Sequence, residues 1–229
     1  MEKQLYSSCQ NGDVSKVKQL LNNPQINVNY QVHGQTPFFI ACHEGHIEVV
    51  KLLLNDERVD INKEDKDHWT PFFAAWDAEN IEVLKLLLSD ERVDVNKSKY
   101  DDCWTPIFIA CYSGILENIT LVLNDKRFDI NKVEGHFERT PFFIACWTGQ
   151  IETVEYILAS GSEVNLNIKD KEGNTAIDLA RSRERDLGEG GKFSRKKRKL
   201  FKDCKIIRIV WKKSKWDKDN IENSIRISW

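Results

Sequence analysis

The chain has 229 residues, of which 31% are charged and 41% are apolar, ordinary values for a globular protein. No apolar run approaches the roughly 18 residues that a transmembrane helix needs, and residues 1–5 lack the apolar segment of a secretory signal. The composition excludes collagen-like and wholly disordered chains, and it predicts a protein of the cytoplasm or the nucleus.

Charge is divided unevenly along the chain. The formal net charge is −2, but residues 1–180 hold 17 Lys and Arg against 29 Asp and Glu, whereas residues 181–229 hold 17 against 7. The body is therefore acidic, at about −12, and the end of the chain is basic, at about +10. The two parts call for separate interpretation.

A repeat of 34 to 35 residues runs through the body. Thr-Pro begins at Thr36, Thr70, Thr105 and Thr140, and a degenerate Thr-Ala begins at Thr175, so the intervals are 34, 35, 35 and 35 residues. Self-similarity at a fixed period of this length indicates a stack of small supersecondary units.

Each copy is predicted to contain two short helices. Thr is a favoured N-cap and Pro suits the first helical position, so each Thr-Pro predicts the start of a first helix. Gly45, Gly114 and Gly149 follow the first apolar stretch and fit a left-handed residue at a helix end.

The second helix repeats its apolar positions in the same register in every copy. These positions are i, i+3, i+6 and i+7, which form one face of a helix. They are occupied by Val14, Val17, Leu20 and Leu21; by Ile47, Val50, Leu53 and Leu54; by Ile81, Leu84, Leu87 and Leu88; by Leu116, Ile119, Val122 and Leu123; and by Ile151, Val154, Ile157 and Leu158. Stacked copies are expected to share a continuous core.

A polar segment separates each second helix from the next Thr, and we expect it to project as an extended finger that contains a turn. Each such segment begins near an Asn, namely Asn29, Asn62, Asn96, Asn131 and Asn165. With the Thr-Pro helix start and the Gly between the helices, this pattern resembles the ankyrin repeat family over about residues 2–185.

The resemblance implies an all-α solenoid of stacked helix-turn-helix repeats with projecting fingers. Repeats are expected at about residues 2–35, 36–69, 70–104, 105–139 and 140–174, with a partial cap at 175–187. Together these form one domain, residues 1–187. Residues 188–229 form a basic tail with aromatic residues, and the sequence leaves open whether this tail is ordered.

The helices depart from the family's pattern at two positions. The His of the family's helix start is replaced by Phe39, Phe73, Phe108 and Phe143, and by Asp178 in the last copy. These rings are expected to pack between helices, which would leave the fingers less firmly tied. Glu79 replaces the Gly between the helices of the third repeat, at an expected cost of about 1 kcal/mol.

The fingers also depart from the pattern. The family's Gly two residues before Thr is retained as Gly34 and Gly173, but it is replaced by His68, Cys103 and Glu138 in the central copies. A different, longer turn is expected at those three tips.

No constellation of residues predicts chemistry. Cys9, Cys42, Cys111 and Cys146 share one column of the first helices, about 8 to 10 Å apart, beyond the roughly 7 Å limit for a disulfide, so they are expected to be reduced and buried. Residues 42–46, Cys-His-Glu-Gly-His, lack a second ligand pair at a zinc-site spacing. No phosphate-binding loop, nucleophile elbow or metalloprotease motif occurs. We expect no metal, no cofactor and no enzyme activity.

The resemblance implies that a partner binds at the finger tips and at the exposed ends of the first helices. The candidate residues there are Trp69, Asp77, Asp101, Asp102, Trp104, Tyr112, Phe137, Arg139 and Trp147. Rigid aromatic side chains beside charges are typical of interface hot spots. The structural alternative is that Trp69 and Trp104 pack on neighbouring fingers, in place of the missing Gly and His.

The tail carries a basic run, formed by Arg195, Lys196, Lys197, Arg198 and Lys199. Such a run fits a nuclear localisation signal, a phosphate-binding patch or a solvated tail. Residues 204–211 are apolar and β-prone, and a segment of this kind tends to dock on a surface, the acidic body included. Nucleic acid and an anionic membrane are further candidate partners of the tail.

The sequence thus favours a monomeric scaffold or adaptor that binds a protein partner, and the acidic body favours a basic one. The concave face of the stack is the expected binding surface. The alternative is a nucleic-acid-associated or nuclear regulatory factor that acts through its basic tail, with salt-dependent binding.

Overall fold

A computed structural model describes residues 1–97 and 104–179. It forms two compact units, Met1–Pro106 and Ile107–Trp229, and each is described by itself. All regular structure of the described residues is helical, apart from isolated bridges such as those between Val32 and Gln35 and between Lys169 and Thr175. The predicted all-α class is confirmed.

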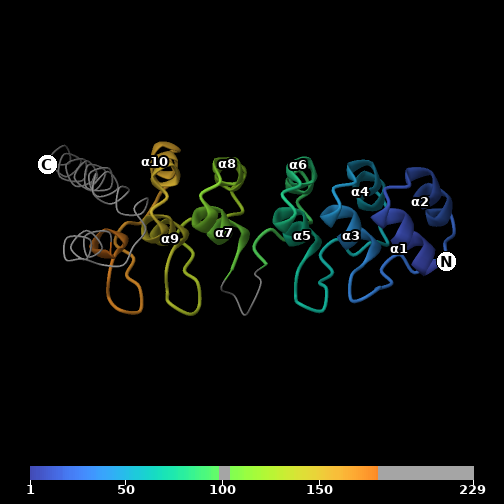
Figure 1. Cartoon of the computed structure of the whole chain (residues 1–229), viewed down its shortest axis with the longest axis horizontal. Coiled ribbons are helices and arrows are strands. Elements are labelled where there is room, and N and C mark those ends of the chain that lie inside the picture. Colours follow the sequence, from blue (N-terminus) through green and yellow to red (C-terminus); the bar gives the residue numbers. More distant parts are fainter. Residues whose placement is uncertain (98–103, 180–229) are drawn as a thin grey trace, which may run out of the picture. The chain divides into compact units, whose positions relative to one another are not determined.

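The first unit consists of three helix pairs: α1 (Glu2–Gln10) with α2 (Val14–Leu21), α3 (Pro37–His43) with α4 (Ile47–Leu54), and α5 (Pro71–Asp77) with α6 (Ile81–Leu88). Helix α3 contacts both α1 and α5, and α4 contacts both α2 and α6. The first helices therefore form one row and the second helices another, and the fingers project past the first row (Figure 1).

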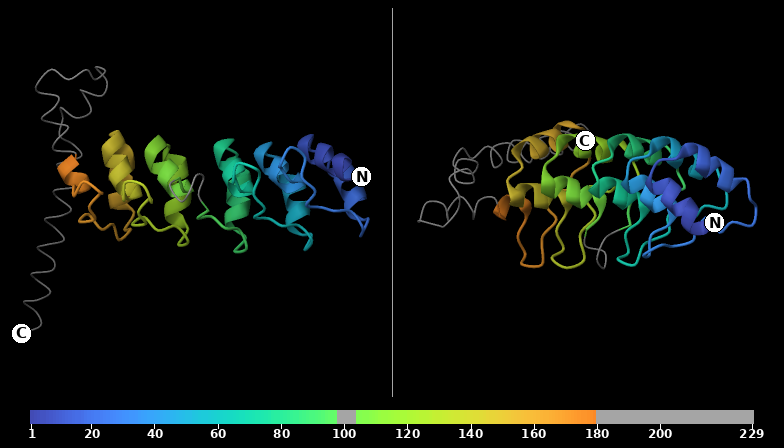
Figure 2. Two further views of the ribbon diagram at one scale, coloured as in Figure 1. Left: turned by 90° about the horizontal axis from the view of Figure 1, so that it is seen from below. Right: turned by 45° about the vertical axis from the view of Figure 1, so that its right-hand side comes forward.

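The second unit repeats this arrangement with two pairs: α7 (Pro106–Ser113) with α8 (Leu116–Asn124), and α9 (Pro141–Thr148) with α10 (Ile151–Ala159). Helix α10 packs on α9 and on α8. Residues 176–179 are helical and begin a further copy. Within this unit the fingers project past the first helices, away from the second helices (Figure 2).

The predicted helix starts are present. The hydroxyl of Thr36 accepts a hydrogen bond from the backbone N–H of Phe39 at 3.1 Å, and Thr70 and Thr140 cap their helices in the same way. Each cap satisfies one of the backbone donors that a helix start leaves without a partner.

The turn between the two helices uses a left-handed residue, as predicted. Gly45, Gly114 and Gly149 have φ of 76°, 73° and 79°, and Glu79 adopts φ of 55° at the same position. Gly45 is also required sterically, because a Cβ there would lie 2.6 Å from an amide oxygen of Asn80.

The close approach of Asn80 to Gly45 lets the Asn80 side chain bond to the end of α3. The Asn80 side chain, just before α6, reaches back to the end of α3 and donates to the carbonyls of Cys42 and His43 at 3.1 and 2.6 Å. In the second unit Gln150 donates in the same way to Tyr112 at 3.0 Å. These bonds satisfy helix-terminal carbonyls that would otherwise lack a donor.

Paired phenylalanines fill the core between the first helices. Phe38, Phe39, Phe72, Phe73, Phe108, Phe142 and Phe143 are all buried. The prediction that Phe in place of the family's His packs between helices is therefore confirmed.

The buried face of the second helices is wider than predicted. Val49 and Val83 are fully buried although the predicted stripe omits them, whereas Ile47 and Ile81 are only half-buried. The reason is that α4 packs on its own first helix and on the second helices at both sides, so more than one stripe is covered.

The four cysteines of the first helices are reduced and buried, as predicted. Burial raises the pKa of the Cys9 thiol to about 12 and holds the pKa of Cys42 well above its usual value. These thiols are therefore uncharged and unreactive near neutral pH.

The expectation of loosely tied fingers is wrong. The Asn62 side chain donates to the carbonyl of Arg92 at 2.7 Å and accepts from the N–H of Asp94 at 2.8 Å. Asn29 makes the same two bonds to Arg58 and Asp60. An amide side chain supplies both a donor and an acceptor, so it joins the bases of successive fingers as a backbone bridge would.

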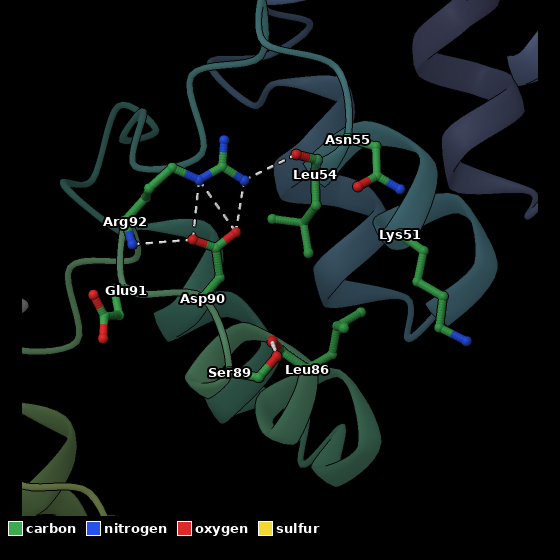
Figure 3. A pocket seen from close by; sticks show the side chains of 8 residues that line it. All are labelled: Lys51, Leu54, Asn55, Leu86, Ser89, Asp90, Glu91 and Arg92. Atoms are coloured by element: carbon green, nitrogen blue, oxygen red, sulfur yellow. Dashed lines mark hydrogen bonds and ion pairs between the residues drawn. The ribbon is translucent and has the colours of Figure 1, made fainter.

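In the first unit, the arginine that follows α4 and the one that follows α6 each contact the end of the second helix before it. Arg92 forms an ion pair with Asp90 at 2.6 Å and donates to the carbonyl of Leu54, at the end of α4, at 2.9 Å (Figure 3). Arg58 pairs with Asp56 in the same way and donates to the carbonyl of Leu21 at 2.8 Å. We call this Asp-X-Arg contact with the preceding helix end the arginine joint.

Candidate partner-binding site

The finger of residues 63–69 is closed by its own acidic side chain. The N–H of Asp65 donates to the carbonyl of Trp69, and the Asp65 carboxylate accepts the N–H groups of Asp67 and Trp69, all at 2.9 Å. Three residues lie inside this turn, against two between Val32 and Gln35 in the preceding finger. The longer turn predicted here is present.

The left-handed conformation nevertheless survives without glycine. His68 has φ of 63° and Glu138 has φ of 56°, close to the region that Gly34 and Gly173 occupy. Non-glycine residues pay a small steric penalty there, which the surrounding hydrogen bonds offset.

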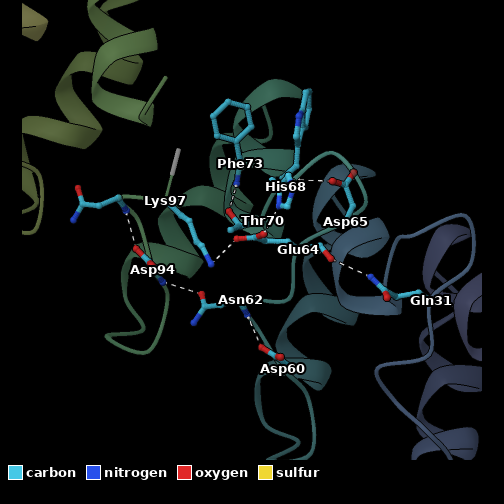
Figure 4. A network of polar contacts seen from close by, with 12 residues as sticks. Gln31, Asp60, Asn62, Glu64, Asp65, His68, Thr70, Phe73, Asp94 and Lys97 are labelled. Carbon is cyan, nitrogen blue, oxygen red and sulfur yellow. Dashed lines mark hydrogen bonds and ion pairs between the residues drawn. The ribbon is translucent and has the colours of Figure 1, made fainter. Parts of the chain in front are cut away.

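Glu64 ties this finger to its neighbours in the first unit (Figure 4). Its carbonyl accepts from the Gln31 amide at 3.0 Å, and its carboxylate forms an ion pair with Lys97 and a hydrogen bond with the His68 ring. Hydrogen bonds from Lys97 and then His68 hold the pKa of the Glu64 carboxyl below its usual value. The finger that carries Trp69 is therefore held from both sides.

Trp69 packs on its own repeat. Its ring meets that of Phe73, at the start of α5, edge-on at 5.1 Å, and the side chain is half-buried. Part of the ring remains exposed beside the charged finger tip.

Arg139 occupies the same position, just before Thr, in the second unit. Its guanidinium carbon lies 4.8 Å from the ring centre of Phe137 and 5.3 Å from those of Phe143 and Trp147. It faces the Asp170 carboxylate at 3.5 Å. The side chain of Arg139 is only 12% exposed and its Nε has no hydrogen-bond partner. We call these four side chains with Asp170 the arginine–aromatic cluster.

The finger of residues 134–139 is rigidly built around this cluster. The buried carboxylate of Glu134 accepts the N–H of Phe137 at 2.7 Å and that of His136 at 3.1 Å. The N–H of Lys171, in the next finger, donates to the carbonyl of Phe137 at 3.0 Å. Phe137 itself is 47% exposed, so the finger presents a large aromatic side chain on a fixed backbone.

The other predicted residues come from further segments of the two units. In the first unit, Asp77 is exposed at the end of α5 and Trp104 is half-buried. In the second unit, Tyr112 is exposed at the end of α7. Asp101, Asp102 and the basic run of residues 195–199 lie outside the described residues. Among the described candidates, Phe137, Arg139 and Trp147 lie together in the arginine–aromatic cluster.

Three acidic residues that organise the fingers were not predicted: Asp65, Glu134 and Asp170. The Asp170 carboxylate is 1% exposed, accepts the N–H groups of Glu172 and Asn174 and faces Arg139. All three lie five or six residues before a Thr, so this spacing was available as a signal in the sequence. It was masked by the general abundance of acidic residues.

An open cleft of about 400 Å³ lies between α4 and α6, on the side of the second helices (Figure 3). Lys51, Leu86 and Arg92 line it. Lys51 forms an ion pair with Glu48, and Arg92 belongs to an arginine joint, so both charged groups of the cleft already have partners within the protein. We assign no ligand to this cleft.

Within residues 1–97 and 104–179, no group of three or more His, Cys, Asp and Glu side chains is arranged to hold a metal ion. No helix in that part of the chain is long and apolar enough to cross a membrane.

Comparison with known proteins agrees with this architecture. A family model of ankyrin repeats in three copies matches residues 5–99 and 94–170. A search of curated proteins gives no match.

Solved ankyrin repeat structures resemble the chain. The ankyrin repeat protein EF0377 is 27% identical, with a TM-score of 0.66 over 80% of this chain and 92% of that one. The ankyrin repeat domain of Bcl-3, of the IkappaB family, is 23% identical, with a TM-score of 0.70 over 79% and 80%. An ankyrin repeat domain from Acinetobacter baumannii is 19% identical, with a TM-score of 0.70 over 91% and 98%.

Proposed function

Because the chain belongs to the ankyrin repeat family, whose repeats generally mediate protein–protein interactions, we propose that it is a scaffold or adaptor that binds a protein partner. The partner contacts the finger tips and the exposed ends of the first helices. Trp69 and Asp77 contribute in the first unit, and Tyr112, Phe137 and Trp147 contribute in the second.

The exposed Phe137 on its rigid finger is the observation that carries this proposal. A binding residue that is already fixed loses little conformational entropy when a partner arrives. Glu134 fixes the backbone of this finger, and Arg139 packs against one face of the ring. Large aromatic side chains in such settings are the commonest hot spots.

The net charge of the body supports a basic partner. Residues 1–180 carry about −12, and a field of that sign attracts cationic segments and raises the rate of encounter. Binding is therefore expected to weaken as salt is added, while the contact with Phe137 persists.

The test compares Phe137→Ala with Tyr156→Ala, a substitution of a similarly exposed aromatic residue on α10. A partner identified by affinity capture with the full-length chain is titrated against both variants. Phe137→Ala is expected to weaken binding at least about tenfold, whereas Tyr156→Ala leaves it unchanged. Equal affinities of the two variants would remove Phe137 from the binding surface.

A second candidate function is binding of nucleic acid through the tail, which the excess of 17 basic over 7 acidic residues after residue 180 favours. The full-length chain would then bind oligonucleotides with an affinity that falls steeply with salt. Replacement of the five basic residues 195–199 by Gln should abolish that binding. Absence of binding by the unaltered chain at low salt would contradict this function.

A further inference from the structure

The outward face of the second helices differs between the two units. In the first unit each Glu on this face is neutralised three residues later: Glu48 pairs with Lys51, and Glu82 pairs with Lys85, both at 2.7 Å. In α10 the position three residues after Glu152 is Glu155, so a second carboxylate stands where α4 and α6 have an ammonium group.

Helix α10 therefore presents an uncovered acidic and aromatic stripe. Glu152, Glu155, Tyr156 and Ala159 follow the spacing i, i+3, i+4 and i+7, and all four are exposed, Tyr156 at 36%. Neither glutamate forms an ion pair with any residue in the described part of the chain. Like charges at this spacing repel each other, so a cation bound here relieves an unfavourable interaction.

Helix α8 continues the same pattern. Glu117 is exposed and Thr120 stands where α4 and α6 have Lys, so this helix also has no neutralising partner three residues on. Because α8 and α10 pack side by side, their outward glutamates belong to one surface of the second unit. We call this surface, made of Glu117, Glu152, Glu155 and Tyr156, the α8–α10 face.

The chain itself contains a segment of complementary chemistry. Residues 192–205, which lie outside the described residues, include eight Lys and Arg against one Asp, together with Phe193 and Phe201. Basic and aromatic residues complement a surface of carboxylates around a tyrosine ring, because cations are attracted both to carboxylates and to the face of an aromatic ring.

The length of the chain permits this contact. The last described residue is Leu179, and 16 peptide units separate it from Arg195, which can span about 50 Å when extended. The nine residues of α10 cover only about 14 Å. A segment tethered so closely has an effective concentration on the order of millimolar, so weak individual ion pairs suffice to hold it.

We propose that residues 192–205 dock on the α8–α10 face of their own chain. The basic tail is then a partner of the second helices, on the opposite side of the first helices from the fingers, and the finger side stays open for the protein partner. A polyanion that binds the same basic residues competes with this internal contact.

The experiment measures trypsin cleavage of the full-length chain within residues 195–199, at about 20 mM and about 300 mM salt. Docking shields these sites at low salt, and screening releases them, so cleavage should accelerate at least about fivefold as salt rises. The variant Glu152→Lys with Glu155→Lys should be cleaved rapidly at both salt concentrations. The milder Glu152→Gln with Glu155→Gln should fall between that variant and the unaltered chain.

The matched control is Glu48→Lys with Glu82→Lys, which changes the net charge by the same amount on the first unit. It should retain the slow cleavage at low salt, and circular dichroism should show that every variant keeps its helices. Two results would overturn the proposal: equally rapid cleavage of the unaltered chain at both salt concentrations, or protection that survives both substitutions on α10. The second result would place the tail on another surface or on a bound polyanion.

Discussion

The tie between fingers can be tested at Asn62. Asn62→Ala removes two hydrogen bonds, to the carbonyl of Arg92 and from the N–H of Asp94, while leaving the backbone conformation allowed. A net value of about 1 kcal/mol per bond gives a loss of about 2 kcal/mol. Since Asn62 is only half-buried, water replaces part of the lost contacts, and the expected loss is about 1 to 2 kcal/mol.

Urea unfolding reports this loss directly, with tryptophan fluorescence, to which Trp69 and Trp76 of the first unit contribute, and with circular dichroism for the helices of the whole chain. Repeat proteins can unfold in parts, so the two signals should be compared rather than merged. Asn55→Ala is the control, because Asn55 is exposed and its side chain makes no hydrogen bond to another residue in the described part of the chain. A loss below about 0.5 kcal/mol for Asn62→Ala would refute the role of the Asn side chain in tying the fingers.

Three further outcomes follow from the fold. Gly45→Ala should lower the free energy of unfolding by about 2 to 3 kcal/mol, because the new Cβ combines a positive φ with a 2.6 Å clash. Gly161→Ala, which has φ of 78° but open space around it, should lower it by about 1 kcal/mol. Urea titration of both variants separates the cost of the clash from that of the backbone strain. Cys9, whose pKa is raised to about 12, should react with a thiol reagent at pH 8 only as fast as the chain opens, so rapid labelling of the folded protein would contradict its burial. Hydrogen bonds from Arg58 hold the pKa of the Asp56 carboxyl below its usual value of 3.8. The pair therefore stabilises the folded state above that pH and loses its effect as the pH falls through the lower pKa of the folded state. Arg58→Gln should make the free energy of unfolding fall less steeply on acidification, as measured by urea titration from pH 5 to pH 2.5.

The repeat architecture was predictable because its signals are local and recur. Thr36 and Gly45 mark the two ends of a first helix by rules that need no tertiary context, and the same rules hold one period later. The width of the buried face was not predictable in this way. Val49 is buried because helices lie on both sides of α4, and such neighbours are invisible to a single helical stripe.

The candidate site was predictable only as a set of residue types. Arg139 was identified as an exposed charge, whereas in the structure it lies beneath Phe137 and faces a buried carboxylate 31 residues further on. A pairing over that distance depends on how two fingers meet, which no local pattern encodes. The firmness of the fingers was misjudged for the same reason, because the partners of Asn62 belong to the next repeat.

The arginine joint bears on how the chain could grow. Each joint consists of an arginine that follows one second helix and the end of the second helix before it. In a chain with a duplicated block of residues 56–89, the copied Arg58 would therefore meet the end of α4, and Arg92 would meet the end of the first copy of α6. Tandem duplication within the first unit is thus self-compatible: a lengthened protein needs no compensating substitution at either seam. The loop at residues 160–162, Ser-Gly-Ser, carries no arginine, and a block copied from there would lack this connection.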